Sequence, residues 1–185
     1  LGSCCFVRQP LKVPAIAVYY RRITDGKTKI YKKFGRLNEI PNICLTYFFE
    51  YKNKLNMTNE ELAKRDYVLC IDKSASMGKP YKKTTRWKHA KEQTEGLARK
   101  CAEFDSDGID IHVFASAVKS YYGVTADKVE QIFTENEPGN STATHLVLKT
   151  VFDTYFAKKA AGTAKPITVI VATDGEPDDR DAVAK

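Results

Sequence analysis

The chain from residue 66 onward alternates short aliphatic runs with longer amphipathic stretches. Tyr67–Ile71, Ile109–Phe114 and Ile167–Ala172 are compact runs of the kind found in strands buried on both faces of a sheet. Arg86–Phe104 instead repeats its apolar residues at the i, i+3, i+4, i+7 spacing of one helix face. That face is formed by Trp87, Ala90, Thr94, Leu97, Ala98 and Cys101.

Shorter elements fill the second half of the pattern. Val118–Tyr122 predicts an edge strand and Ala126–Glu135 a short helix with its apolar side inward. Pro138-Gly139-Asn140 predicts a turn, and a final helix is expected to begin near Asp179. A longer helix between them is expected to bury one side, made of Leu148, Val151, Phe152, Tyr155 and Phe156.

Residues 1–65 follow a different pattern, and we expect them to form a separate N-terminal segment. Ala15–Ile23 and Thr28–Phe34 are β-branched and aromatic runs around an Asp-Gly pair, which predicts a hairpin. Thr58 and Glu61 have the spacing of a capping box, which predicts a linker helix ending near Arg65. A second apolar run, Ile43–Phe49, lies between them.

Strands separated by helices predict right-handed crossovers and a doubly wound, mostly parallel α/β sheet over residues 66–185. Ligands of such sheets bind beyond the carboxyl ends of the strands. Three polar loops are expected to meet there: Asp72–Lys79, Gly139–His145 and Thr173–Asp178.

Charge and cysteine content add two expectations. Residues 1–65 hold 13 Lys or Arg against 5 Asp or Glu, a net +8, whereas residues 66–185 hold 17 against 18, a net −1. The basic excess therefore belongs to the N-terminal segment alone. The 5 cysteines include no C-x-x-C pair, and Cys70 and Cys101 fall at positions expected to be buried. Such free thiols favour a reducing, cytoplasmic compartment; no segment has the length and apolarity of a transmembrane helix.

The candidate chemistry lies in the three loops. Asp72-Lys73-Ser74-Ala75-Ser76 follows the first buried strand, Thr173-Asp174-Gly175 follows the last, and Ser141-Thr142-Ala143-Thr144 begins a helix. These loops offer carboxylate and hydroxyl oxygens, with no Cys or His at metal-ligand spacing. Hard oxygen ligands in an incomplete shell are what Mg²⁺ prefers. Alternate residues leaving a strand can share one side, so Ser74 and Ser76 can both reach an ion beside Asp72.

This set resembles the metal-ion-dependent adhesion site (MIDAS) of von Willebrand factor A (vWA) domains, whose fold is Rossmann-like. The resemblance covers Asp66 to Lys185. It implies that Ser74, Ser76 and Thr142 touch Mg²⁺ directly, with Mn²⁺ or Ca²⁺ as substitutes, and that Asp72 and Asp174 act mainly through bound waters. Thr142 is preferred over Thr144 because the family's threonine usually precedes a core leucine, here Leu148, by six residues.

The resemblance also implies a function and an incomplete domain. An ion held by neutral oxygens accepts a Glu or Asp from a partner protein, so a Mg²⁺-dependent protein–protein interaction is expected rather than catalysis. The family's fold continues beyond its T-D-G loop, so we expect roughly 50 or more residues of the vWA domain to be missing after Lys185. Alternatively, the runs Ala15–Tyr20 and Ile43–Phe49 cover the edge left by the last strand.

Two other functions fit parts of the sequence. A Mg²⁺-dependent phosphatase loop of the D-x-D-x-T kind needs an acid where this chain has Ser74, which cannot act as a general acid at neutral pH. RNA binding would use the basic aromatic hairpin, but a hairpin with inward aromatic and outward basic residues explains the same pattern. The residues concerned are Tyr19, Tyr20, Arg21, Arg22, Lys29, Tyr31, Lys32, Lys33 and Phe34. Nucleic acid is therefore the less favoured partner.

Overall fold

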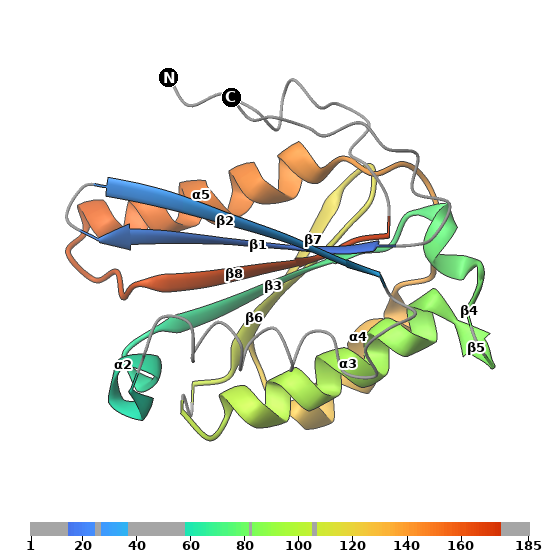
Figure 1. The fold of residues 1–185 in the computed structure, drawn as a ribbon, viewed down its shortest axis with the longest axis horizontal. Helices are drawn as coiled ribbons and strands as arrows, with labels where there is room; N and C mark the ends of the chain where they lie inside the picture. The colour runs from blue at the N-terminus through green and yellow to red at the C-terminus, as the bar shows by residue number, and fades with distance from the viewer. Residues whose placement is uncertain (1–14, 25–26, 37–57, 82, 105–106, 175–185) are drawn as a thin grey trace.

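A computed structural model describes residues 15–24, 27–36, 58–81, 83–104 and 107–174 of the chain (Figure 1). The predicted strands and helices that fall in these residues occur in the expected order. The elements are β1 (Ala15–Thr24), β2 (Lys27–Arg36), α2 (Asn59–Ala63), β3 (Asp66–Asp72), β4 (Pro80–Tyr81), β5 (Thr84–Thr85), α3 (Arg86–Cys101), β6 (Ile109–Phe114), β7 (Val118–Val124), α4 (Val129–Glu135), α5 (Thr144–Ala160) and β8 (Ile167–Ala172). Of these, β4 and β5 are two short strands that the sequence did not predict. Two short 3₁₀ turns lie at Ala75–Gly78 and Ala126–Lys128.

The central sheet has the strand order β7-β6-β3-β8. β3 pairs in parallel with both β6 and β8, and β7 runs antiparallel to β6 at one edge. Each parallel pair requires a crossover, made by α3 between β3 and β6 and by α5 before β8. The predicted doubly wound, mostly parallel α/β fold is confirmed.

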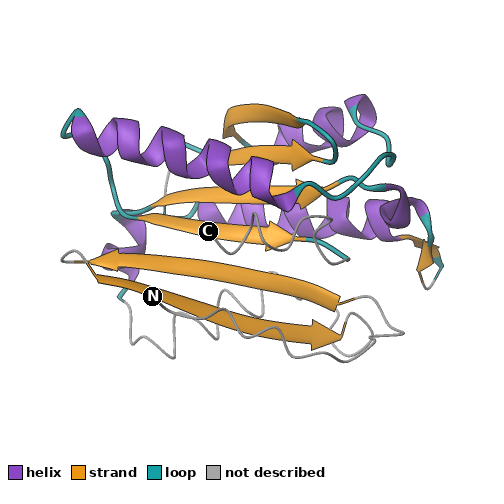
Figure 2. Ribbon diagram, turned by 90° about the horizontal axis from the view of Figure 1, so that it is seen from above, coloured by secondary structure: helices purple, strands orange, loops and turns teal. Residues whose placement is uncertain are grey.

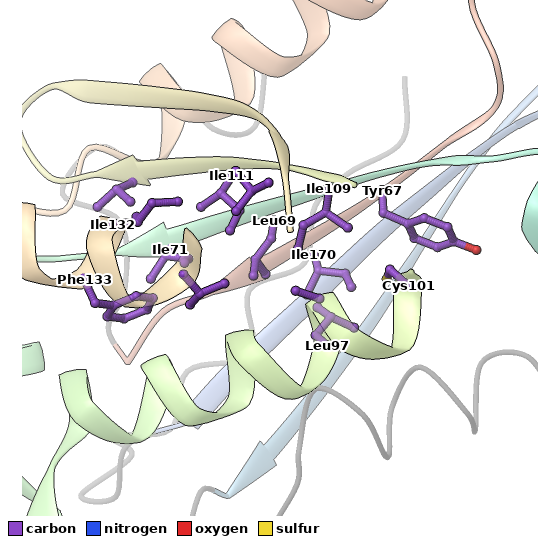
Figure 3. Packing of buried hydrophobic residues seen from close by; sticks show 14 of the residues in the cluster. Tyr67, Leu69, Ile71, Leu97, Cys101, Ile109, Ile111, Ile132, Phe133 and Ile170 are labelled. Carbon is purple, nitrogen blue, oxygen red and sulfur yellow. The ribbon is translucent and has the colours of Figure 1, made fainter. Parts of the chain in front are cut away.

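Successive residues of β3 point to opposite faces of the sheet, and this alternation creates two cores. Figures 1 and 2 show α3 and α4 on one face and α5 on the other. Tyr67, Leu69 and Ile71 belong to the cluster under α3 and α4, which Figure 3 shows packed against Leu97 and Phe133. The other cluster lies under α5 and contains Val68, Cys70, Phe114, Val147, Val151, Tyr155, Ile167, Val169 and Val171.

Helix α3 buries the predicted face. Trp87, Leu97 and Cys101 are buried, and Thr85 caps the helix by accepting a hydrogen bond from the Lys88 amide at 3.2 Å. Cys70 and Cys101 are both fully buried, as expected, and burial raises the pKa of the Cys70 thiol. The other three cysteines lie outside the described residues.

The predicted inward side of α5 is partly wrong. Val151 and Tyr155 are buried as expected, but the helix also buries Val147 and leaves Phe156 47% exposed. The buried positions are four residues apart, so they form one narrow stripe. Apolar residues lie almost all around this helix, and composition therefore cannot identify the side that faces the sheet.

Among the residues that the structure describes, the N-terminal segment contains a hairpin and a short helix. β1 and β2 pair as an antiparallel hairpin, and the Thr58 capping box with Glu61 begins α2. β1 lies beside β8 in both views, while the hairpin remains its own two-stranded sheet (Figures 1 and 2). The run Ile43–Phe49 and the helix expected near Asp179 lie outside the described residues. No helix in the described ranges has both the length and the apolarity needed to cross a membrane.

Gly108 provides a test of the packing at the start of β6. Its φ is +82°, and an added Cβ would lie 2.8 Å from the Gly123 backbone carbon, so both strain and collision oppose any side chain. Gly162 has a φ of +72°, but a Cβ added there would meet no neighbouring atom within 4 Å, which makes it a matched control. We expect Gly162→Ala to cost about 1 kcal/mol and Gly108→Ala about 2–3 kcal/mol in urea denaturation. Equal losses would contradict the close approach of the two backbones.

Candidate functional site

Asp72 lies at the carboxyl end of β3, at the centre of the parallel strands. It is fully buried and pairs in register with Phe114, the last residue of β6. One carboxylate oxygen, Oδ1, accepts a hydrogen bond from the Ser74 amide at 2.7 Å. The other, Oδ2, accepts one from the Thr173 hydroxyl at 2.6 Å, directly after β8. The carboxylate therefore joins the loops that leave two neighbouring strands.

The electrostatic setting of Asp72 favours a nearby cation. Burial raises the pKa of the Asp72 carboxyl above its ordinary value, and the negative charge of Asp174 acts in the same direction. Hydrogen bonds from Thr173 and from Ser74 oppose this shift in the pKa by stabilising the ionised form. A cation placed between the two carboxylates would remove their mutual repulsion.

A chain of hydrogen bonds connects the first candidate loop with the last. The hydroxyl oxygens of Ser74 and Ser76 lie 3.0 Å apart, and the Ser76 hydroxyl donates to Asp174 Oδ1 at 2.6 Å. Ser74 is buried and the Asp174 side chain is only 1% exposed, while the intervening Ala75 faces solvent. The expectation that Ser74 and Ser76 share one side of the loop is confirmed.

The loop before α5 is fastened to the same place by backbone bonds. The Gly139 amide donates to the Lys73 carbonyl at 2.7 Å, and the Ala75 amide donates to the Asn140 carbonyl at 3.2 Å. Asn140 adopts a φ of 64°, a conformation that asparagine tolerates better than most residues. Thr142 follows in this loop and is buried. The described parts of the three predicted loops thus meet at one edge of the sheet.

Thr144 remains a second candidate hydroxyl in this loop. It is the first residue of α5, and its amide donates to the Thr142 carbonyl at 3.0 Å. Its Oγ1 atom is buried and has no hydrogen-bond partner among the described residues. A buried hydroxyl without a partner is costly, so its position suits a group that binds there. The unpartnered hydroxyl therefore keeps Thr144 as an alternative to Thr142 as the ligand.

Two further residues take part in the cluster, and sequence reasoning assigned neither of them a role. Thr173 holds Asp72, as described above; its place beside Asp174 at the end of β8 was the only signal. Arg86 is the first residue of α3, and its Nη1 donates to Asp174 Oδ2 and, at 3.3 Å, to the Ser76 carbonyl. A single arginine at a helix start has no sequence signature, and the contact with Asp174 spans 88 residues.

The side chains present fit a hard divalent cation better than a soft one. The candidate atoms are two carboxylates and several hydroxyls, all oxygen. Within the described residues, His, Cys, Asp and Glu form no group of three or more that could hold a metal. Among the described residues, hydroxyl oxygens therefore make up most of the candidate ligand groups.

Comparison with known proteins agrees with the fold. Residues 67–176, more than half of the chain, match the family model described as the von Willebrand factor type A domain. This range begins in β3 and includes all five candidate residues of the site. No individual curated protein and no solved structure matched the chain. The chain therefore belongs to the von Willebrand factor type A domain family, whose members are typically protein-interaction modules.

Proposed function

We propose that this domain binds one Mg²⁺ ion in the manner of a MIDAS and uses it to recognise a Glu or Asp side chain of a partner protein. The observation that carries this proposal is the hydrogen-bond chain from Ser74 through Ser76 to Asp174. It brings together side chains 98 residues apart in the sequence at the carboxyl ends of adjacent parallel strands. That is the place where ligands of open α/β sheets bind.

The resemblance to a MIDAS implies the roles of the residues, and the hydrogen bonds of the two carboxylates are consistent with those roles. Both oxygens of Asp72 and both oxygens of Asp174 accept hydrogen bonds from the protein. We assign these carboxylates to orienting hydroxyls and metal-bound waters, and Ser74, Ser76 and Thr142 to direct contact. Mn²⁺ or Ca²⁺ would be accepted by the same oxygen donors.

Because the proposed direct ligands of the ion are neutral hydroxyls, the site would recognise a negatively charged group. Hydroxyl oxygens leave most of the charge of a divalent ion uncompensated, and a bound ion supplies Lewis acidity toward an incoming carboxylate. A carboxylate from a partner then provides the missing negative ligand. Ala75 and Ser141 are exposed beside the cluster, so a partner chain can approach it from solvent.

A calorimetric Mg²⁺ titration of the whole chain tests the metal site. We expect one binding event in the wild type and a loss of at least roughly 100-fold in affinity in both Asp72→Ala and Ser74→Ala. Ser116→Ala removes an exposed hydroxyl just beyond β6 and should bind Mg²⁺ as the wild type does. Equal heats in wild type, Asp72→Ala and Ser74→Ala would refute the proposed ligand set.

Recognition of an acidic group needs its own measurement. Peptides that each carry one Glu are selected from a displayed library on the immobilised protein. The wild type should retain them in Mg²⁺ and release them in EDTA, and Ser74→Ala should not retain them. Replacing that Glu by Gln should abolish retention. Peptides that bind equally well in EDTA would contradict a metal-mediated contact.

We propose a binding role and no catalytic one. A phosphatase loop of the D-x-D-x-T kind places a second acid two residues after the first, and this position is Ser74, whose hydroxyl lies beside Ser76. Mg²⁺-dependent hydrolysis of a small phosphate ester, lost in Asp72→Ala, would overturn this part of the proposal.

A further inference from the structure

Arg86 brings a positive charge into the candidate metal site. Its guanidinium contacts Asp174 Oδ2 and the Ser76 carbonyl, so it touches two of the five candidate residues. The Asp174 side chain is 1% exposed and the Arg86 side chain 18% exposed. This ion pair is therefore largely shielded from solvent and is poorly screened by salt.

The location of Arg86 is unfavourable apart from this contact. It is the first residue of α3, where the positive end of the helix dipole disfavours a cation, and no acidic residue lies in the first turn. Its Nε atom is also buried without a hydrogen-bond partner among the described residues. Asp174 compensates for these costs by pairing with the guanidinium.

We propose that Arg86 is a built-in counter-cation that competes with the divalent ion for Asp174. This inference rests on the proposed function, because it concerns the same site. In the absence of metal the guanidinium neutralises Asp174 and keeps the loops after β3 and β8 together. When the ion binds, two cations share one buried carboxylate, and their repulsion lowers the affinity for the ion. Arg86 thereby sets the metal concentration at which the domain becomes competent to bind its partner.

The opposite role for Arg86 is also physically reasonable and gives the opposite result. If the guanidinium only positions Asp174 for the ion, its removal weakens metal binding. If the guanidinium competes with the ion, removal of its charge strengthens metal binding and lowers the thermal stability of the metal-free protein. Arg86→Gln is suitable because it keeps a hydrogen-bond donor and removes the charge.

The experiment compares Mg²⁺ titrations of wild type, Arg86→Gln, Arg86→Lys and Arg99→Gln. We expect Arg86→Gln to bind Mg²⁺ on the order of tenfold more tightly, because the repulsion is gone. Arg86→Lys keeps the charge and should stay close to the wild type. Arg99 lies on the same helix and pairs with Glu95, but its side chain is 65% exposed, so Arg99→Gln is the matched control and should change nothing.

Thermal unfolding in EDTA gives a second readout that needs no metal. Arg86→Gln should melt roughly 5 °C or more below the wild type, because Asp174 is left buried and unpaired. The double variant Arg86→Gln/Asp174→Asn should lose less than the sum of its two single variants. Should Arg86→Gln be unfolded in EDTA, the Mg²⁺ titrations of all four proteins are repeated in a stabilising osmolyte that keeps it folded, and tighter binding than in the wild type is still expected there.

The possible outcomes separate the two proposals. Equal or weaker Mg²⁺ binding by Arg86→Gln, with normal binding by the wild type, overturns the competition and leaves the metal site intact. Absence of Mg²⁺ binding in every variant overturns both, and the coupling measured in EDTA would then identify Arg86–Asp174 as a purely structural pair. Tighter binding by Arg86→Gln together with its lower stability in EDTA supports the inference.

Discussion

Replacing Phe114 by alanine should lower the free energy of unfolding by about 3–5 kcal/mol, which is the usual cost of removing a fully buried phenyl ring. Phe114 ends β6, is 0% exposed, and packs in the core between the sheet and α5. It also stands opposite Asp72 in the parallel pairing, and its carbonyl accepts a hydrogen bond from the Lys73 amide at 2.8 Å. The ring therefore supports the strand end from which the candidate site begins. Urea denaturation followed by circular dichroism measures the loss.

Phe156→Ala is the matched control for this prediction. Phe156 lies on α5, the helix that covers the same core, but is 47% exposed. Removing its ring should cost less than about 1 kcal/mol. Similar losses for Phe114→Ala and Phe156→Ala would show that the core under α5 is not the one described.

The second large effect is expected at Thr142. Thr142→Val removes the hydroxyl with almost no change in volume and should weaken Mg²⁺ binding by roughly 10–100-fold, because one of the three proposed direct ligands is lost. Thr144→Val should bind Mg²⁺ as the wild type does. It should also be about 1 kcal/mol more stable, since it removes a buried hydroxyl that has no partner in the described part of the chain. Calorimetry and urea denaturation of the two variants measure both quantities.

The result for this pair assigns the ligand. If Thr144→Val loses the ion and Thr142→Val keeps it, the ligand is the first residue of α5 and the assignment by sequence spacing is wrong. In that case the unpartnered Thr144 hydroxyl described above was the better guide.

The sheet could be predicted because its strands have a strong local signal. Ile109–Phe114 and Ile167–Ala172 were predicted with the bounds that the structure shows, and Tyr67–Ile71 is one residue shorter at each end than β3. A short aliphatic run bounded by polar residues indicates both that the segment is a strand and where the strand begins and ends. The convergence of the loops then followed from the parallel arrangement, since the carboxyl ends of such strands share one edge.

Features that depend on contacts between distant residues could not be predicted in this way. The inward side of α5 was misjudged because Val147 and Phe156 are both apolar and only packing distinguishes them. Arg86 was overlooked because its partner is 88 residues away. The position of β1 beside β8 corresponds to the alternative in which Ala15–Tyr20 covers the edge of the last strand; the exposed edge suggested that alternative, and hairpin periodicity did not.

Because main-chain hydrogen bonds join the loops, the exposed side chains around the site can be replaced without separating the loops. Gly139 with Lys73, and Ala75 with Asn140, are joined through main-chain atoms, which persist when most side chains are replaced. Ala75 and Ser141 are exposed on these loops. New side chains at these two positions would therefore alter which protein surfaces fit against the domain while the inner oxygen cluster keeps its geometry.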